Sequence, residues 1–264
     1  MLDAEGAEKG KIALPIQFNE IVREDLVQKA IFAIWSHNRQ PYGVKEGAGM
    51  RASAKLSRRR RNYRGSYGKG ISRVPRKIMT RRGTQMNMVG AEAPGTVGGR
   101  RAHPPQSEKK FTLKINDSER KKAIRSALAA VMDSARVKQR GHKVPENYPF
   151  VLDNSVESFG KTKAFVAALG KLSLDAELAR ASQKKVRSGK GKSRGRKYQR
   201  KKGPLVVVGS DCALSKSARN VAGLDIVKIN ELNAEILAPG THIGRLTLFT
   251  KSAIERLHKE KLFM

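Results

Sequence analysis

The chain has 264 residues, of which 55 are Lys or Arg and 23 are Asp or Glu, so its formal net charge is +32. The hydrophobic fraction of 39% suffices for a packed core and argues against wholesale disorder, while the single cysteine excludes an internal disulfide and a cysteine-based zinc site. No apolar run approaches the roughly 20 residues of a membrane span and no secretory signal opens the sequence, so we expect a soluble, intracellular protein of one large or two small domains.

The first half of the chain contains few predicted elements. Residues 11–16 read as a short edge strand, because Pro15 has no amide hydrogen to give to a sheet. Residues 21–37 are predicted to be a helix, since their apolar positions recur every three or four residues. The 61 residues from 47 to 107 show neither a helical nor a strand period. A stretch of that length without its own core is either functional or disordered.

Regular structure resumes after residue 111. Asn116 and Glu119 have the spacing of a capping box at the start of a helix that ends near Gly141. Residues 148–152 are a strand candidate, and residues 161–169 are predicted to be a helix with Gly170 at its end. Residues 172–178 alternate like a strand but consist of helix-forming types, so both structures stay open.

The last sixty residues have the clearest pattern. Residues 205–208 are predicted to be a buried strand, and further strands are predicted at 224–229 and 245–249. Helices are predicted at 214–221, 231–237 and 251–259. Strands that alternate with helices predict an α/β fold, in which a layered helix–sheet domain surrounds a largely parallel sheet. We assign residues 1–46 and 108–264 to this domain and residues 47–107 to a long basic internal loop that extends from it.

The positive charge is concentrated in two segments. Residues 47–107 contain 15 Lys or Arg and one acid, and residues 184–202 contain 11 Lys or Arg and no acid. The other 184 residues carry 29 basic and 22 acidic side chains. Two polycationic insertions in an otherwise ordinary domain indicate a polyanionic partner.

Signals for catalysis are weak. Cys212 is interpreted as a small buried thiol, and the five histidines show no metal-ligand spacing. Residues 209–217 follow a predicted strand and open a predicted helix, as a phosphate-binding loop does, but they lack its second glycine. We interpret them as a strand-to-helix turn capped by Ser210 or Asp211. The sequence therefore predicts no enzyme, with no catalytic residue, no cofactor, no metal and no small-molecule substrate.

The basic segments mix arginine, glycine and tyrosine. Arginine binds phosphates bidentately, glycine lets the backbone approach closely, and Tyr63 and Tyr67 have the chemistry to stack on bases. RNA is favoured over DNA because no DNA-reading motif is present, and a membrane is disfavoured because neither segment is an amphipathic helix. The predicted RNA-binding residues are Arg51, Lys55, Arg58, Arg59, Arg60, Arg61, Tyr63, Arg64, Tyr67, Lys69, Arg81, Arg82, Arg100, Arg101, His103, Lys190, Lys192, Arg194, Arg196, Lys197, Tyr198, Arg200, Lys201 and Lys202.

An ordered set of short motifs runs through nearly the whole chain. One of them reads Gly99-Arg100-Arg101-Ala102-His103-Pro104-Pro105. The others lie at residues 39–43, 51–54, 73–76, 118–120, 125–130, 194–198, 218–220, 232–233, 237–240 and 244–245. In this order and spacing the chain resembles the family of large-subunit ribosomal protein four, in its archaeal and eukaryotic form.

The resemblance implies a structural constituent of the large ribosomal subunit in the cytoplasm. It implies a globular domain that binds large-subunit ribosomal RNA, and a loop that lines the nascent-polypeptide exit tunnel near its constriction. Residues 72–82 would then form the tip of the loop, with Ser72, Arg73, Arg76 and Lys77 near the lumen. The implied partners are that RNA, neighbouring proteins including large-subunit protein twenty-two, and the nascent polypeptide. A free RNA-binding regulator, an enzyme acting on RNA and a DNA-compacting protein remain alternatives.

Overall fold

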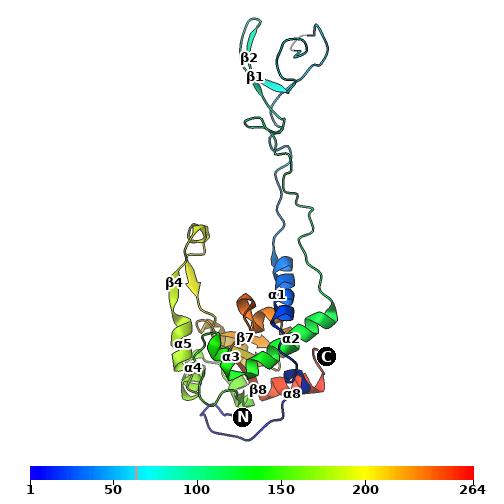
Figure 1. Cartoon of the computed structure of the whole chain (residues 1–264). Coiled ribbons are helices and arrows are strands. Elements are labelled where there is room, and N and C mark those ends of the chain that lie inside the picture. Colours follow the sequence, from blue (N-terminus) through cyan, green and yellow to red (C-terminus); the bar gives the residue numbers. More distant parts are fainter. Residues whose placement is uncertain (63–64) are drawn as a thin grey trace. The chain divides into compact units, whose positions relative to one another are not determined.

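The computed structural model divides the chain into two compact units (Figure 1). The sheet unit comprises Met1–His37 and Thr112–Met264, and the loop unit comprises Asn38–Phe111. The structure describes residues 1–62 and 65–264. The predicted loop, residues 47–107, lies inside the loop unit.

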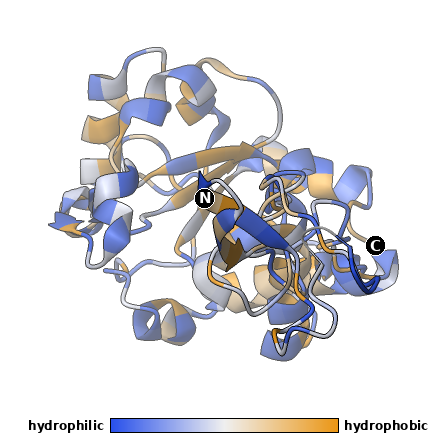
Figure 2. Cartoon of the chain, turned by 90° about the horizontal axis from the view of Figure 1, so that it is seen from above, coloured by the Kyte–Doolittle hydropathy of each residue, from blue (hydrophilic) through white to orange (hydrophobic). Residues whose placement is uncertain are grey.

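A four-stranded parallel sheet lies at the centre of the sheet unit, as the α/β prediction requires. Its strands, in the order β3-β8-β6-β7, are β3 (Val151–Leu152), β8 (Thr247–Thr250), β6 (Leu205–Val208) and β7 (Asp225–Lys228). Every residue of β6 and β8 is buried. Strands covered on both faces read as continuous apolar runs, which is why residues 205–208 can be identified as a strand from the sequence. Figure 2 shows hydrophobic residues along strands in the interior.

Helices cover both faces of this sheet. The α-helices are α1 (Glu24–Asn38), α2 (Asp117–Met132), α3 (Ser134–Gln139), α4 (Thr162–Lys171), α5 (Asp175–Ser182), α6 (Ala213–Ser217), α7 (Ala234–Leu237) and α8 (Lys251–Lys259). Alternate strand residues point to opposite faces. Leu205 and Val207 accordingly pack in one core with α1, α2 and α8, whereas Val206 and Val208 pack in a second core with α4 and α6.

Short 3-10 helices complete the sheet unit, at Ile16–Phe18, Asn154–Ser158, Lys190–Arg194, Ala218–Asn220, Ile229–Glu231 and Pro239–Thr241. Within the ranges that the structure describes, no helix is long and apolar enough to cross a membrane.

The strand predicted at residues 11–16 is wrong. The sheet edge beside β3 is taken by the first residues of the chain, where Leu2 donates to the Val151 carbonyl at 2.8 Å and accepts from the Asp153 amide at 2.9 Å. With that edge filled, the following segment has no strand to pair with, and Pro15 instead precedes the 3-10 helix Ile16–Phe18.

Several predicted boundaries and caps also differ. Residues 172–178 contain no strand: residues 172–174 form the turn after α4, and residues 175–178 form the start of α5. The strand at 148–152 shortens to Val151–Leu152, and Gly170 lies inside α4. Asn116 precedes α2 but its side chain accepts no capping bond. Cys212, not Ser210 or Asp211, occupies the N-cap of α6, and its side chain makes no capping bond. Asp211 instead pairs with Lys228 at 2.8 Å. The helix at 251–259 is confirmed at both ends.

The loop unit consists of two long segments that run side by side and end in a β-hairpin. The Val44 amide donates to the Pro105 carbonyl at 3.2 Å. Gly49, with a φ of 77°, lies so close to the opposite segment that a Cβ there would be 2.4 Å from the Arg100 Cα. The hairpin consists of β1 (Arg76–Arg82) and β2 (Gln85–Gly90), with a bulge between Ile78 and Thr80.

The second basic segment also forms a hairpin, which belongs to the sheet unit. Strands β4 (Lys184–Val186) and β5 (Tyr198–Arg200) pair antiparallel around the 3-10 helix Lys190–Arg194. We call residues 184–202 the basic hairpin. None of the side chains in its two strands is buried.

Candidate RNA interface

Among the residues that the structure describes, the cations of the loop unit have no acidic partners. Residues 38–111 contain 19 Lys or Arg and only three acids. Over residues 1–62 and 65–264, every ion pair lies in the sheet unit. The loop unit therefore presents a surface of uncompensated positive charge, which repels itself and attracts a polyanion.

Nearly all of the predicted RNA-binding side chains that the structure describes are exposed to solvent. Tyr67 is half-buried, and Tyr63 and Arg64 lie outside the described residues. In the loop unit the exposed members are Arg51, Lys55, Arg58, Arg59, Arg60, Arg61, Lys69, Arg81, Arg82, Arg100, Arg101 and His103. In the basic hairpin they are Lys190, Lys192, Arg194, Arg196, Lys197, Tyr198, Arg200, Lys201 and Lys202. Only Lys202 of these forms an ion pair among the described residues, with Asp225 at 3.0 Å.

Tyr67 in the loop unit and Tyr198 in the basic hairpin contact cations. The guanidinium carbons of Arg60 and Arg73 lie 5.1 and 5.0 Å from the centre of the Tyr67 ring. In the basic hairpin, the Lys184 ammonium lies 5.0 Å from the Tyr198 ring centre. Such cation–π contacts are worth about 0.5–1 kcal/mol at exposed sites, so the rings hold neighbouring cations close together.

The residues predicted near the tip have different surroundings. Ser72 and Arg73 are exposed, and Lys77 lies opposite Val89 in the β1–β2 hairpin. Arg76 is half-buried, and its guanidinium donates to Ser72 Oγ at 2.9 Å and Ser66 Oγ at 3.2 Å. Arg76 therefore ties the start of β1 to the segment before it, while the exposed Arg73 lies over the Tyr67 ring.

Charged side chains of the sheet unit hold the base of the basic hairpin. Arg180 Nη2 donates to the Lys202 carbonyl at 2.7 Å, and Arg245 Nε donates to the Gly203 carbonyl at 3.0 Å. The Lys202 ammonium is within 3.0 Å of Asp225. Charged donors make hydrogen bonds roughly twice as strong as neutral ones. The hairpin thus projects from a fixed point beside β6.

Arg180 is held in turn by a fully buried carboxylate. Glu177 accepts from Arg180 Nη2 at 2.6 Å and from the Lys143 amide at 2.9 Å, and its Oε1 lies 2.7 Å from His142 Nδ1. Burial alone raises the pKa of Glu177, but the bonds from Arg180, His142 and Lys143 outweigh it and hold the pKa at about 2. Burial lowers the pKa of His142. The neutral imidazole then donates its Nδ1 hydrogen to the ionised Glu177, which can only accept.

Sequence reasoning missed this supporting network. Arg180, Glu177 and Arg245 are single charged residues in ordinary helical or strand patterns, and nothing in their spacing distinguishes them from solvated side chains. The position of Arg245 offers one signal, since it precedes the apolar run of β8 and belongs to a motif shared with the family it resembles. A cation at the edge of a buried strand needs buried acceptors.

The signals for catalysis lead to no assembled site. The thiol of Cys212 is partly exposed rather than buried, and burial raises its pKa, so it stays protonated at neutral pH. The Gly209 amide donates to Ser252 Oγ at 3.2 Å rather than facing an open loop. Within the described portion of the chain, no group of three or more His, Cys, Asp or Glu side chains is placed to hold a metal ion.

The comparisons with known proteins all point to one family, and the similarity covers nearly the whole chain. The sequence matches the family described as "Ribosomal protein L4/L1 family" over residues 12–260. It is 46% identical to the large ribosomal subunit protein uL4 of Nanoarchaeum equitans, across 100% of this chain and 98% of the relative. It is 44% identical to uL4 of Methanococcoides burtonii, across 97% and 96% of the two chains, and 44% identical to uL4 of Methanosphaera stadtmanae, across 94% and 91%. With its α/β sheet unit and two basic insertions, the chain belongs to the ribosomal protein L4/L1 family.

Proposed function

We propose that this protein is a structural constituent of the large ribosomal subunit and binds large-subunit ribosomal RNA through the loop unit and the basic hairpin. The observation that carries the proposal is the distribution of ion pairs. Acids and bases are paired across the sheet unit, whereas the described cations of the loop unit and all but one of the basic hairpin have no carboxylate within 4.0 Å. RNA phosphates are the partners that such a surface lacks.

Family membership supports the ribosome as the location of this RNA. The relatives with full-length similarity carry the name large ribosomal subunit protein uL4. Most of the cations meet RNA phosphates, because long, flexible, exposed Lys and Arg side chains position a protein on a backbone rather than read bases. Because these relatives are named as proteins of the large ribosomal subunit, we infer a structural rather than an enzymatic role.

The loop unit is proposed to reach the wall of the nascent-polypeptide exit tunnel. Two features support this. Its two segments run side by side without a core of their own, and they end in the exposed β1–β2 hairpin. In this proposal Ser72, Arg73 and Lys77 lie near the lumen, Arg76 braces them, and the neighbouring protein is large-subunit protein twenty-two.

A free RNA-binding regulator would use the same surfaces, and sedimentation separates the two roles. Lysate from cells that express the full chain is fractionated on a sucrose gradient, with and without a high-salt wash, and the chain is quantified against another large-subunit protein. A structural constituent remains in the large-subunit peak at a ratio near one after the wash. A chain that is substoichiometric or released by salt is a regulator, and the structural role is then wrong.

A further inference from the structure

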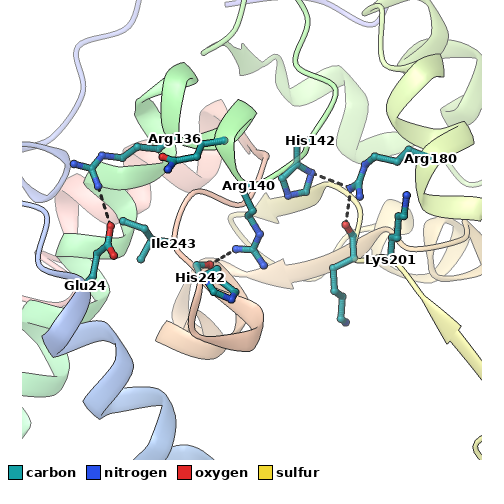
Figure 3. Close-up of a pocket in the computed structure, with 10 residues that line it drawn as sticks. Glu24, Arg136, Arg140, His142, Arg180, Lys201, His242 and Ile243 are labelled. Carbon is teal, nitrogen blue, oxygen red and sulfur yellow. Dashed lines mark hydrogen bonds and ion pairs between the residues drawn. The ribbon is translucent and has the colours of Figure 1, made fainter. Parts of the chain in front are cut away.

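A basic pocket opens on the sheet unit at the foot of the basic hairpin. It has a volume of about 550 Å³ and is lined by Arg136 and Arg140 from α3 and its end, Arg180 from α5, and Lys201 and Lys202 after β5. Figure 3 shows Arg140 between the Glu24–Arg136 pair on one side and Arg180 with Lys201 on the other. Five cations from three parts of the chain thus surround one space.

Three of these five cations are neutralised by the protein itself. Arg136 pairs with Glu24 at 3.3 Å, Arg180 pairs with Glu177 at 2.6 Å, and Lys202 pairs with Asp225 at 3.0 Å. In the described parts of the chain, neither Arg140 nor Lys201 has a carboxylate oxygen within 4.0 Å. The pocket therefore retains about two unbalanced positive charges.

Arg140 is held in place without being neutralised. Its Nη2 donates to the Pro239 carbonyl at 2.7 Å and its Nη1 donates to the His242 carbonyl. Burial, together with the charges of Arg245 and Arg180, lowers the pKa of Arg140 to about 10. A half-buried cation that faces other cations is costly unless an anion compensates it. The two carbonyls fix the direction of the guanidinium, so the group is preorganised for that anion.

The shape and lining favour a phosphate over a whole nucleotide. In the part of the chain that the structure covers, no Phe, Tyr or Trp lines the pocket. Of its two histidines, His142 is buried, so a base would find only the His242 imidazole to stack on. Arginine and lysine together are typical phosphate ligands. Lys201 follows directly on β5, whose exposed Arg200 belongs to the RNA surface proposed above. A strand of RNA lying on the basic hairpin would continue into this pocket.

We propose that Arg140 and Lys201 bind a backbone phosphate of large-subunit RNA in this pocket, extending the interface of the basic hairpin to the end of α3. The assignment rests on the proposed RNA-binding function. The proposal adds to the RNA interface a cation from the end of α3, which is far in sequence from either basic segment. Arg136, Arg180 and Lys202 line the pocket around the two phosphate ligands.

The test measures binding of the full chain to a transcript of large-subunit RNA over a range of salt concentrations. Arg140→Gln and Lys201→Gln should each weaken binding roughly tenfold and reduce the salt slope by about 0.7–0.9, the loss expected for one phosphate contact. Arg140→Gln removes the bond to the Pro239 carbonyl and can disturb that turn. The Lys201 side chain makes no hydrogen bond in the described structure, so we expect Lys201→Gln to fold normally. Lys259→Gln, on the exposed side of α8, removes the same charge outside the pocket and should change the slope far less.

A second readout locates the contact. Acetylation of Lys201 by an amine-reactive ester, followed by mass spectrometry, should slow when the transcript is bound. Protection of Lys201 with a slope loss confined to the pocket variants supports the proposal. Protection by millimolar inorganic phosphate but not by RNA means a free-anion site, and equal slope losses in Lys259→Gln mean a general charge effect; either result overturns it. If the wild-type chain does not bind the transcript at all, the proposed function fails. The protection of Lys201 by inorganic phosphate then still decides whether the pocket binds anions.

Discussion

Arg245 Nη2 donates a hydrogen bond to Asp225 Oδ2 at 2.6 Å, joining the segment before β8 to the first residue of β7 across the intervening β6. Arg245 is only 1% exposed. Its remaining donors reach the carbonyls of Gly203 at 3.0 Å and Ile236 at 2.9 Å. A buried guanidinium is tolerated only when its donors are satisfied in this way. Arg245 thus fixes the segments of Gly203, Asp225 and Ile236 at the foot of the basic hairpin.

Replacing Arg245 with lysine should destabilise the protein strongly. Lysine keeps the charge but cannot donate in three fixed directions, so at least one buried carbonyl loses its partner. We expect a loss of about 3–5 kcal/mol in the free energy of unfolding, as when a buried ion pair is broken. Urea unfolding of the free protein measures it. Arg219→Lys, at an exposed position, serves as control and should change stability by less than about 0.5 kcal/mol. Equal stability of the two variants would show that the Arg245 network contributes nothing.

The elements that could be predicted from sequence are those whose pattern is set locally. Residues 205–208 form an apolar run because the strand is covered on both faces, and residues 251–259 have a helical period, preceded by a Thr250 side chain that caps the Ala253 amide. The failure at residues 11–16 has a tertiary cause. No local pattern indicates that the first residues of the chain occupy the sheet edge, where the Leu2 amide donates to the Val151 carbonyl.

The same distinction applies to the interface. Charge density alone predicted residues 47–107 and 184–202, because polycationic segments cannot form a core. Arg140 and Arg180 were not predicted, since Arg180 is a single cation on a short helix and Arg140 directly follows another. Only the fold brings them to the foot of the basic hairpin. The antiparallel pairing of β1 and β2 was also missed, because their exposed strands lack the alternation of buried and solvated residues on which strand prediction depends.

Acid should unfold the protein through Glu177 and His142. The folded-state pKa of Glu177 is about 2, against 4.5 for the ordinary carboxyl, so its stabilisation is full above pH 4.5 and is lost as the pH falls towards 2. The pKa of His142 is lowered from 6.5, so protonation of the unfolded chain removes stability as the pH falls below 6.5. Both effects have the same sign, and Arg180, Arg140 and Arg245 add positive charge around them.

Urea midpoints measured between neutral pH and pH 3 check this. The wild-type midpoint should fall on acidification, and Glu177→Gln should flatten the part below pH 4.5 while lowering stability at pH 7, because Arg180 loses its carboxylate. Glu235→Gln, at a half-buried surface position, is a control in which the urea midpoint should still fall below pH 4.5 as in the wild type. A Glu177→Gln profile parallel to the wild type would contradict the assignment.

The basic hairpin should bind phosphates rather than bases. Replacing Arg194, Arg196, Lys197 and Arg200 with glutamine is expected to weaken RNA binding evenly across sequences and to reduce the salt slope by about 0.7–0.9 per lost contact. The control neutralises four cations that have acidic partners, Lys29, Arg120, Lys121 and Arg256, and should change the slope much less. A changed sequence preference at constant slope would indicate base readout instead.

The close approach of the two loop segments depends on Gly49. An alanine there would place its Cβ 2.4 Å from the Arg100 Cα and would also adopt a positive φ. We expect Gly49→Ala to separate the segments and to increase hydrogen exchange of the 40–50 region, where Val44 bonds to Pro105, in the RNA complex. Gly95→Ala has the same backbone strain, with a φ of 88°, but meets nothing within 4 Å. Equal exchange in both variants would mean that strain, not contact, is the cause.

Excision of the β1–β2 hairpin should separate assembly from the tunnel function. The Ala91 amide donates to the Pro75 carbonyl at 2.8 Å, so residues 76–90 can be replaced by two glycines without moving the flanking segments. The cut removes four of the 19 basic residues of the loop unit and leaves the basic hairpin and the sheet unit intact. Because most of the electrostatic attraction to RNA survives, we expect the variant to enter large subunits at normal stoichiometry.

What should change is the narrow region of the tunnel. Purified subunits are first assayed for the variant chain, and translation is then measured with an arrest-prone nascent peptide and with a tunnel-binding antibiotic. We expect altered stalling or altered drug sensitivity, because the excised side chains, among them Lys77, would no longer narrow the lumen. A control variant replaces residues 188–195 of the basic hairpin with two glycines and should leave both assays unchanged. Normal incorporation with wild-type stalling and sensitivity would mean that the hairpin does not line the tunnel, and failed incorporation would mean that it anchors the RNA instead.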